Sequence, residues 1–190
     1  MIGVEFEFYS KNSDLVSLLP LRPGWKIVAE KILHQYELVS PPSTADEILS
    51  DLKLILEDLK ATNEVYLDSN CGLHVHVDCS RKSVSQIAEI LVRYWMTEDF
   101  NFESFPALRE NDFCFKLESL ITLQQLTSCE LSSFSYKDLI FNLPILNKGA
   151  AVNLLALEKF GTLEFRAMGA NFEMEQIQFW IFFLEGICED

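Results

Sequence analysis

The sequence predicts an α+β protein, with a largely antiparallel sheet and helices packed on one face. Segments that alternate apolar and polar residues, the period of a half-buried strand, are interspersed with segments of helical period. Late in the chain two apolar segments flank the short turn 158–161, which indicates an antiparallel hairpin. No linker or low-complexity segment interrupts residues 1–190, and this length favours a single domain.

Six segments are predicted to be strands. The first alternates strictly, with apolar residues on one face and Glu5 and Glu7 on the other. The Pro41-Pro42 pair ends the third strand, because proline cannot donate to a strand ladder. Gly161 stands in the hairpin turn, where a positive φ is expected. The predicted strands are Ile2–Tyr9, Trp25–Ala29, Tyr36–Ser40, Leu73–Cys79, Ala151–Leu157 and Thr162–Met168.

Five segments are predicted to be helices. In the first, Thr44 and Glu47 have the spacing of a capping box, and apolar residues follow at helical spacing. The second is expected to end near Glu98. The last is apolar nearly all round, so it is buried more deeply than the first two or faces another copy or partner. Their positions are Thr44 to Leu59, Val84 to Glu98, Phe115–Leu126, Tyr136–Leu143 and Glu173–Ile187.

The chain is strongly acidic. It has 15 Lys and Arg against 29 Asp and Glu, which gives a formal charge of −14. This balance argues against a nucleic-acid partner, because proteins that bind phosphate backbones cluster Lys and Arg. The surplus carboxylates are suited instead to divalent cations.

The sequence also predicts a cytoplasmic location without a membrane partner. The longest apolar run, Phe179–Leu184, is far shorter than the roughly 20 residues of a bilayer span. The N-terminus enters a predicted strand at Ile2 without the pattern of a secretory signal. The five cysteines are odd in number and have no disulfide-framework spacing, so reduced thiols are expected.

Three predicted strands carry ionisable residues at positions i and i+2 on the face opposite their apolar residues. If these strands are neighbours, the sheet has a floor of carboxylates, imidazoles and a guanidinium. Carboxylate and imidazole ligands suit Mg²⁺ or Mn²⁺. Alternate residues on a strand lie about 6 to 7 Å apart, so Glu5 and Glu7 could serve two ions. The residues are Glu5, Glu7, His74, His76, Glu164 and Arg166, and Glu37 is placed in the same way.

Each of these pairs has a plainer interpretation. A Glu-x-Glu or Glu-x-Arg pair alone is typical of a solvated strand face. His-x-His is rarer here, since the chain has only 3 histidines. Cys71 and Cys79 flank the two histidines, but strand parity places both thiols on the opposite face, which argues against a zinc site. Because the chain lacks a glycine-rich phosphate loop, any nucleotide must be held through metal and arginine.

Six strings in one order resemble the amidoligase family, a branch of the glutamine synthetase and glutamate-cysteine ligase superfamily. The resemblance extends from residue 3 to about residue 181. It implies a glutamine synthetase catalytic-domain-like fold. The strings are Gly3-Val-Glu-Phe-Glu-Phe, Tyr36-Glu-Leu-Val-Ser-Pro-Pro42, Cys71-Gly-Leu-His-Val-His-Val-Asp78, Arg109-x-Asn111-x-Phe-Cys114, Val152-Asn-Leu-Leu-Ala-Leu157 and Gly161-Thr-Leu-Glu-Phe-Arg166.

The resemblance also implies roles for individual residues. It assigns His76, Arg109 and Arg166 to catalysis and to binding ATP or the carboxylate substrate. It assigns five residues to Mg²⁺ or Mn²⁺: Glu5, Glu7, Glu37, His74 and Glu164. The chain departs from the family pattern at 30–32 and at 169–171, which affects the acceptor pocket more than the metals.

The implied activity is ATP-dependent joining of a carboxylate to an amine, each a small molecule or a peptide. A carboxylate is a poor electrophile, so its oxygen is phosphorylated first and an amine then attacks the acyl phosphate. Two alternatives stay open: a metal-dependent phosphoesterase or other hydrolase on the same floor, and a binding module that retains the fold without activity.

Overall fold

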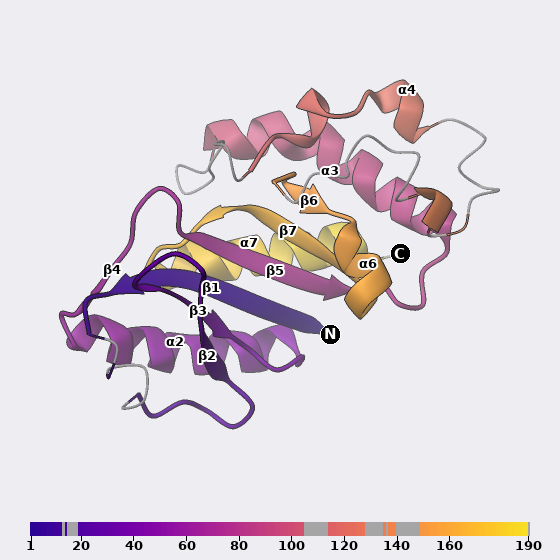
Figure 1. The fold of residues 1–190 in the computed structure, drawn as a ribbon. Coiled ribbons are helices and arrows are strands. Elements are labelled where there is room, and N and C mark those ends of the chain that lie inside the picture. The colour runs from indigo at the N-terminus through magenta and orange to yellow at the C-terminus, as the bar shows by residue number, and fades with distance from the viewer. Residues whose placement is uncertain are drawn as a thin grey trace.

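The protein is an α+β structure built on a mostly antiparallel open sheet, as the sequence predicts (Figure 1). The computed structural model describes residues 1–12, 14, 19–104, 114–127, 135, 137–139 and 149–189. Its strand order is β2-β3-β1-β5-β7-β6, and β4 pairs with β1. The strands are β1 (Ile2–Ser10), β2 (Lys26–Ala29), β3 (Gln35–Val39), β4 (Val65–Tyr66), β5 (Gly72–Asp78), β6 (Val152–Asn153) and β7 (Thr162–Gly169).

One face of the sheet is the hydrophobic core. The alternation predicted for β1 is confirmed, because Phe6 and Phe8 are fully buried on the face opposite Glu5 and Glu7. Helices α2 (Ala45–Ala61), α3 (Val84–Ser104) and α7 (Met174–Cys188) contribute to this core, and α2 and α7 lie behind the sheet in Figure 1. Each large apolar side chain buried in this way contributes about 1.5 to 3 kcal/mol. The other face of the sheet is left for polar side chains.

Most predicted elements are confirmed within one or two residues. The capping box at the start of α2 is present, with the Glu47 amide donating to Thr44 Oγ1 at 3.4 Å. The sequence pattern does not predict β4, which is two residues long and pairs with the end of β1. A segment this short carries too little alternation to be recognised.

The predicted hairpin near the C-terminus is wrong in its first arm. Only Val152–Asn153 form a strand, and Leu155–Phe160 form the short helix α6 where a strand end and a turn were expected. The Asn153 side chain accepts a hydrogen bond from the Leu155 amide at 3.0 Å, which ends the strand and turns the chain. Gly161 does have the predicted positive φ, 71°, but as the left-handed cap of α6.

Two further helix predictions need correction. The segment Phe115–Leu126 is not one helix but a 3₁₀ turn, η1 (Leu117–Ser119), followed by α4 (Leu123–Leu126). Helix α3 continues to Ser104 rather than ending near Glu98, because Glu98 is fully buried against η1. The predicted helix Tyr136–Leu143 falls largely outside the described residues, of which 137–139 are helical.

Helix α7 packs one side into the core and shows two large aromatic side chains on the other. Trp180 and Ile181 are buried, whereas Phe179 and Phe182 are exposed. That a partner covers these phenylalanines stays a prediction. Across the described ranges, no helix combines the length and apolar character needed to cross a membrane.

Candidate active site

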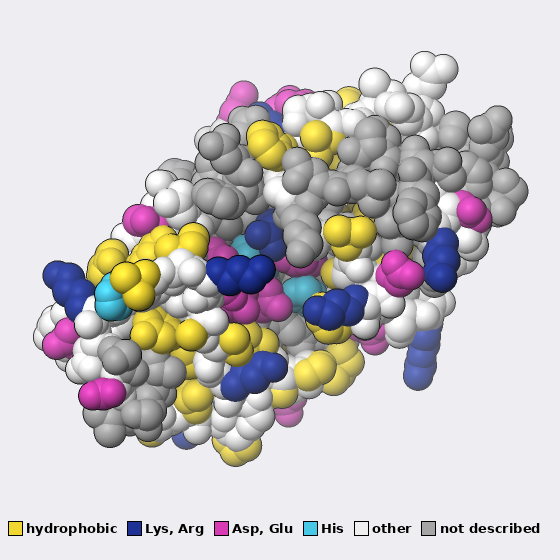
Figure 2. Space-filling view, in the orientation of Figure 1, with side chains coloured by type: hydrophobic (Ala, Val, Ile, Leu, Met, Phe, Trp, Pro, Cys, Tyr) yellow, Lys and Arg dark blue, Asp and Glu magenta, His cyan; other side chains and the backbone are white. Residues whose placement is uncertain are grey.

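The strand register brings the predicted polar residues together on the open face of the sheet. Glu5 on β1 pairs with His74 on β5, and His76 pairs with Glu164 on β7. Glu7 and Glu37 pair across β1 and β3. Figure 2 shows acidic side chains and a histidine gathered at the centre of this face, with basic side chains around them. Because parity alone places each residue on this face, the sequence could predict the grouping once the strands were neighbours.

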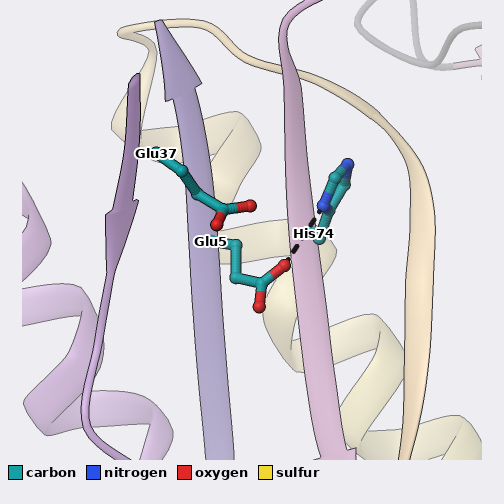
Figure 3. Close-up of side chains that lie close together, drawn as sticks. All are labelled: Glu5, Glu37 and His74. Atoms are coloured by element: carbon teal, nitrogen blue, oxygen red, sulfur yellow. Dashed lines mark hydrogen bonds and ion pairs between the residues drawn. The ribbon is translucent and has the colours of Figure 1, made fainter. Parts of the chain in front are cut away.

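One group of possible metal ligands consists of Glu5, Glu37 and His74. They come from β1, β3 and β5, and one ligand atom from each lies within 4.8 Å of the other two. Figure 3 shows the two carboxylates side by side, with Glu5 directed at the imidazole. His74 Nδ1 is 3.4 Å from Glu5 Oε2, and the His74 side chain is only 2% exposed.

A second group consists of Glu5, His76 and Glu164, and it meets the same distance limit. His76 Nε2 is 3.3 Å from Glu5 Oε1. Glu5 therefore belongs to both groups. This geometry places His76 among possible metal ligands, whereas the family resemblance implies a role at the substrate or nucleotide.

Glu7 is in neither group. Its carboxylate accepts a hydrogen bond from the Gly72 amide at 2.6 Å, and its Oε2 lies 3.8 Å from His74 Nε2. Glu7 thereby ties the start of β5 to β1 and faces the buried imidazole from the other side. Its predicted role as a metal ligand stays a prediction.

Arg166 lies at the β7 side of these groups. Its Nη1 donates a hydrogen bond to Glu164 and lies 3.4 Å from His74 Nδ1. Its Nε is buried and has no hydrogen-bond partner among the described residues. A buried guanidinium donor without an acceptor is costly, so this atom is suited to an anionic group of a ligand.

The carboxylates are packed closely enough to perturb each other. Burial raises the pKa of Glu37 to about 8, and repulsion from Glu5, Glu30 and Glu7 adds to the shift. Burial also acts to raise the pKa of Glu5, but hydrogen bonds with His74 and His76 outweigh it and hold that pKa well below its ordinary value. The pKa of Glu37 is therefore raised at a place where a bound cation would favour the charged form.

Asn153 is a site residue that the sequence analysis did not assign a role. It lies opposite Glu164 on the β6–β7 ladder, and its Nδ2 donates to Glu164 Oε2 at 2.6 Å. The pair is buried. The only available signal was the string Val152-Asn-Leu-Leu-Ala-Leu157 of the family resemblance, because the chain itself shows no i, i+2 pattern of ionisable residues there.

The two cysteines beside the histidines do not face this site. Cys71 and Cys79 are both buried in the core, as strand parity predicted. Burial raises the pKa of the Cys71 thiol to about 12, so it is a poor metal ligand at neutral pH. Arg109, the remaining predicted site residue, lies outside the described residues.

A cavity of about 580 Å³ opens beside the two groups and shares Glu5, Glu37 and His76 with them. Gly3 contributes to its lining because it occupies the next position on the face that carries Glu5 and Glu7 but has no side chain. The lining also includes apolar side chains and one lysine: Val28, Val39, Pro42, Phe160 and Lys26. A volume of this size is typical of sites for small organic ligands.

Comparison with known families places the chain in one of them. A family model described as "Putative amidoligase enzyme" matches residues 7–188, nearly the whole chain. The chain belongs to this amidoligase family. The match includes Glu37, His74, His76, Glu164 and Arg166 and begins just after Glu5. No curated protein shows a significant match to the chain. The family resemblance found in the sequence is therefore confirmed, whereas the substrates of this amidoligase are not given by any relative.

Proposed function

We propose that the protein is an ATP-dependent carboxylate-amine ligase that acts in the cytoplasm through a glutamine synthetase-like sheet site. The observation that carries this proposal is the pair of carboxylate–imidazole groups sharing Glu5 beside the 580 Å³ cavity. Membership of the amidoligase family supports amide formation as the reaction. In this proposal, the two groups bind cations and the cavity binds organic substrates.

The donor set fits Mg²⁺ or Mn²⁺. Oxygen atoms of Glu5, Glu37 and Glu164, with an imidazole nitrogen in each group, are ligands that these cations accept. The raised pKa of Glu37 also supports the fit, because a divalent cation would offset the burial and the repulsion that raise it. When bound, such ions neutralise phosphate charge and polarise the γ-phosphoryl group of ATP.

The reaction follows from the chemistry of amides. A carboxylate oxygen of the acid substrate attacks the γ-phosphorus of ATP, the bond to the bridging oxygen of ADP breaks, and an acyl phosphate forms. The amine then attacks the acyl carbon, and phosphate leaves with the electron pair of the carbon–oxygen bond. A carboxylate of the site takes the proton that the amine loses.

Arg166 has the position to assist these steps. Its Nη1 is anchored on Glu164, while its buried Nε lacks a partner among the described residues. A guanidinium held in this way can stabilise the transferring phosphoryl group or fix the substrate carboxylate. Arg109 is proposed for the same phosphate-facing role from the family resemblance alone.

Product analysis tests the proposal. The protein is incubated with Mg-ATP and a pooled metabolite extract, and both ADP release and new masses are measured. We expect ADP together with a product whose mass equals an acid plus an amine minus water, and neither with Glu5→Gln. Release of phosphate from esters without ATP would instead support the hydrolase alternative. No turnover of any kind by the folded protein would favour the binding module.

A further inference from the structure

We propose that Thr162 is the positioning residue for His76, holding the imidazole so that Nε2 faces Glu5 and Glu164. The inference rests on the metal role proposed above for the second group of ligands. The contact in question, between Thr162 and His76, is not part of either group of possible metal ligands. His76 Nδ1 is 3.0 Å from Thr162 Oγ1, on the side of the ring away from the carboxylates.

The strand register explains why Thr162 reaches the ring. Thr162 begins β7 and lies two residues before Glu164, so both side chains project from the open face. His76 pairs directly with Glu164, and Thr162 pairs with Asp78 on the same ladder. Thr162 is therefore the diagonal neighbour of His76, within reach of a side-chain contact.

The chain fixes Thr162 through the turn that precedes it. Gly161 has a φ of 71° and caps α6, with its amide donating to the Leu157 carbonyl at 3.0 Å. A Cβ at this position would lie 2.9 Å from Ser80 Cβ, so the chain can turn this tightly only at a glycine. The Gly161 carbonyl also accepts a hydrogen bond from the Cys79 amide at 2.8 Å. These hydrogen bonds therefore fix the position of Thr162, at the start of β7, relative to the end of β5.

His76 is held at three points, each on a different part of the ring. Nδ1 meets Thr162, Nε2 lies 3.3 Å from Glu5 Oε1, and the Phe160 ring meets the imidazole edge-on at a centroid distance of 6.1 Å. The Thr162 contact engages Nδ1 and so leaves Nε2 as the nitrogen available to a cation. When Nδ1–H donates to the hydroxyl, Nε2 presents its lone pair toward Glu5 and Glu164.

A hydroxyl can serve either tautomer of the His76 ring. It can accept from Nδ1–H when a cation occupies Nε2, and it can donate to Nδ1 when Nε2–H faces Glu5. His74 provides the contrast, since its ring nitrogens face Glu5, Glu7, Glu164 and Arg166 and no threonine is needed. The two histidines therefore reach the same cluster with different supporting partners.

The test compares Thr162→Val, which keeps the shape but removes the hydroxyl, with Thr162→Ser, which keeps the hydroxyl. Thr62→Val is the matched control, because Thr62 Oγ1 donates to the Leu59 carbonyl at the end of α2, behind the sheet. Thr162→Ala is a second variant without the hydroxyl, in case the valine disturbs folding. The readouts are ¹⁵N NMR of the His76 ring in metal-free protein and calorimetric titration with Mn²⁺.

We expect Thr162→Val to change the His76 ring signals and to weaken Mn²⁺ binding by about 10 to 100-fold, the loss typical for partners that orient metal ligands. Thr162→Ser and Thr62→Val should resemble the unmodified protein. Unchanged His76 signals and Mn²⁺ affinity in Thr162→Val would overturn the inference. If the unmodified protein binds no Mn²⁺, the proposed function fails, and the ring signals alone decide: a change with valine that serine reverses supports positioning, and no change refutes it.

Discussion

Two glutamates in this member of the amidoligase family have a pKa raised first by burial, but their neighbours differ. Burial raises the pKa of Glu98 to about 7, but its two oxygens accept the amides of Leu117 and Glu118 at 2.7 and 2.9 Å. Glu37 has a pKa of about 8, and after burial the main causes are the neighbouring carboxylates Glu5, Glu30 and Glu7. The Glu98 carboxylate is satisfied by backbone donors, whereas Glu37 lies among other carboxylates.

The comparison separates a structural carboxylate from a candidate ligand. The Glu98 carboxylate connects α3 to η1 through these hydrogen bonds, so its role is structural. Glu37 lies among other carboxylates, and crowded carboxylates of this kind with perturbed pKa values are typical of functional sites.

The largest effect is expected from Arg166→Lys. Lysine keeps the positive charge but loses the planar fork and the buried Nε donor, so turnover should fall by roughly 10²-fold or more. Thermal stability and Mg²⁺ binding should change little. Steady-state kinetics on the folded variant provide the measurement, with Arg93→Lys on α3 as a control that should retain turnover. Near-normal turnover of the Arg166 variant would remove this residue from the site.

Glu98→Ala should reduce the free energy of unfolding by about 1 to 3 kcal/mol, because two backbone amides lose their acceptor. Asp99→Ala is the matched control on the same helix, since the exposed Asp99 carboxylate forms an ion pair with Lys116. Urea unfolding measures both. A Glu98 variant as stable as the Asp99 variant would show that the buried carboxylate does not anchor η1.

Gly3→Leu tests the cavity separately from the metal ligands. A Cβ at residue 3 would lie 3.8 Å from His76 Cβ and from Ser40 Oγ, so alanine fits while a longer side chain extends toward the cavity. Because the leucine side chain would fill part of the cavity, we expect the KM for the organic substrate to rise about tenfold, with Mn²⁺ affinity preserved. Gly3→Ala is the control. An unchanged KM in the leucine variant would place the substrate elsewhere.

The smallest effect concerns pH. Glu37 and Glu98 bind protons more tightly in the folded protein than their ordinary pKa of 4.5 predicts. Both therefore stabilise the fold at low pH, and that stability is lost as pH rises to about 7 for Glu98 and about 8 for Glu37.

Mg²⁺ should distinguish the Glu37 carboxyl from the Glu98 carboxyl. Adding Mg²⁺ should reduce the part of the pH-dependent fall in melting temperature that Glu37→Gln removes. It should not change the part that Glu98→Gln removes. Melting curves from pH 5 to 8 with and without Mg²⁺ give the comparison. A decline that Mg²⁺ does not alter in the unmodified protein would argue against a cation beside Glu37.

The open face could be predicted from the sequence because strand parity is a local property. Once Glu5, His74 and Glu164 alternate with buried residues, neighbouring strands must bring them together. Strand parity does not predict how these residues divide into the two groups of possible metal ligands, because that depends on the direction of each side chain across the sheet. His76 thus lies close to Glu5 and Glu164, whereas the Glu7 carboxylate accepts a hydrogen bond from the Gly72 amide.

The regions that differ from the sequence-based prediction are governed by side-chain hydrogen bonds. The end of α3 depends on Glu98, whose partners lie 19 and 20 residues further along the chain. The strand expected over Ala151–Leu157 is cut short by the Asn153 side chain, which holds both the Leu155 amide and Glu164. Apolar periodicity does not record such hydrogen bonds, so neither boundary could be read from it.

We propose that Glu5 joins two cation sites on the open face. Calorimetric titration with Mn²⁺ tests it most directly, using the unmodified protein, Glu5→Gln and Glu98→Gln. The account predicts two ions per chain in the unmodified protein and in Glu98→Gln, and loss of both in Glu5→Gln, because both groups need this carboxylate. Two ions bound with unchanged affinity in a folded Glu5→Gln variant would contradict it.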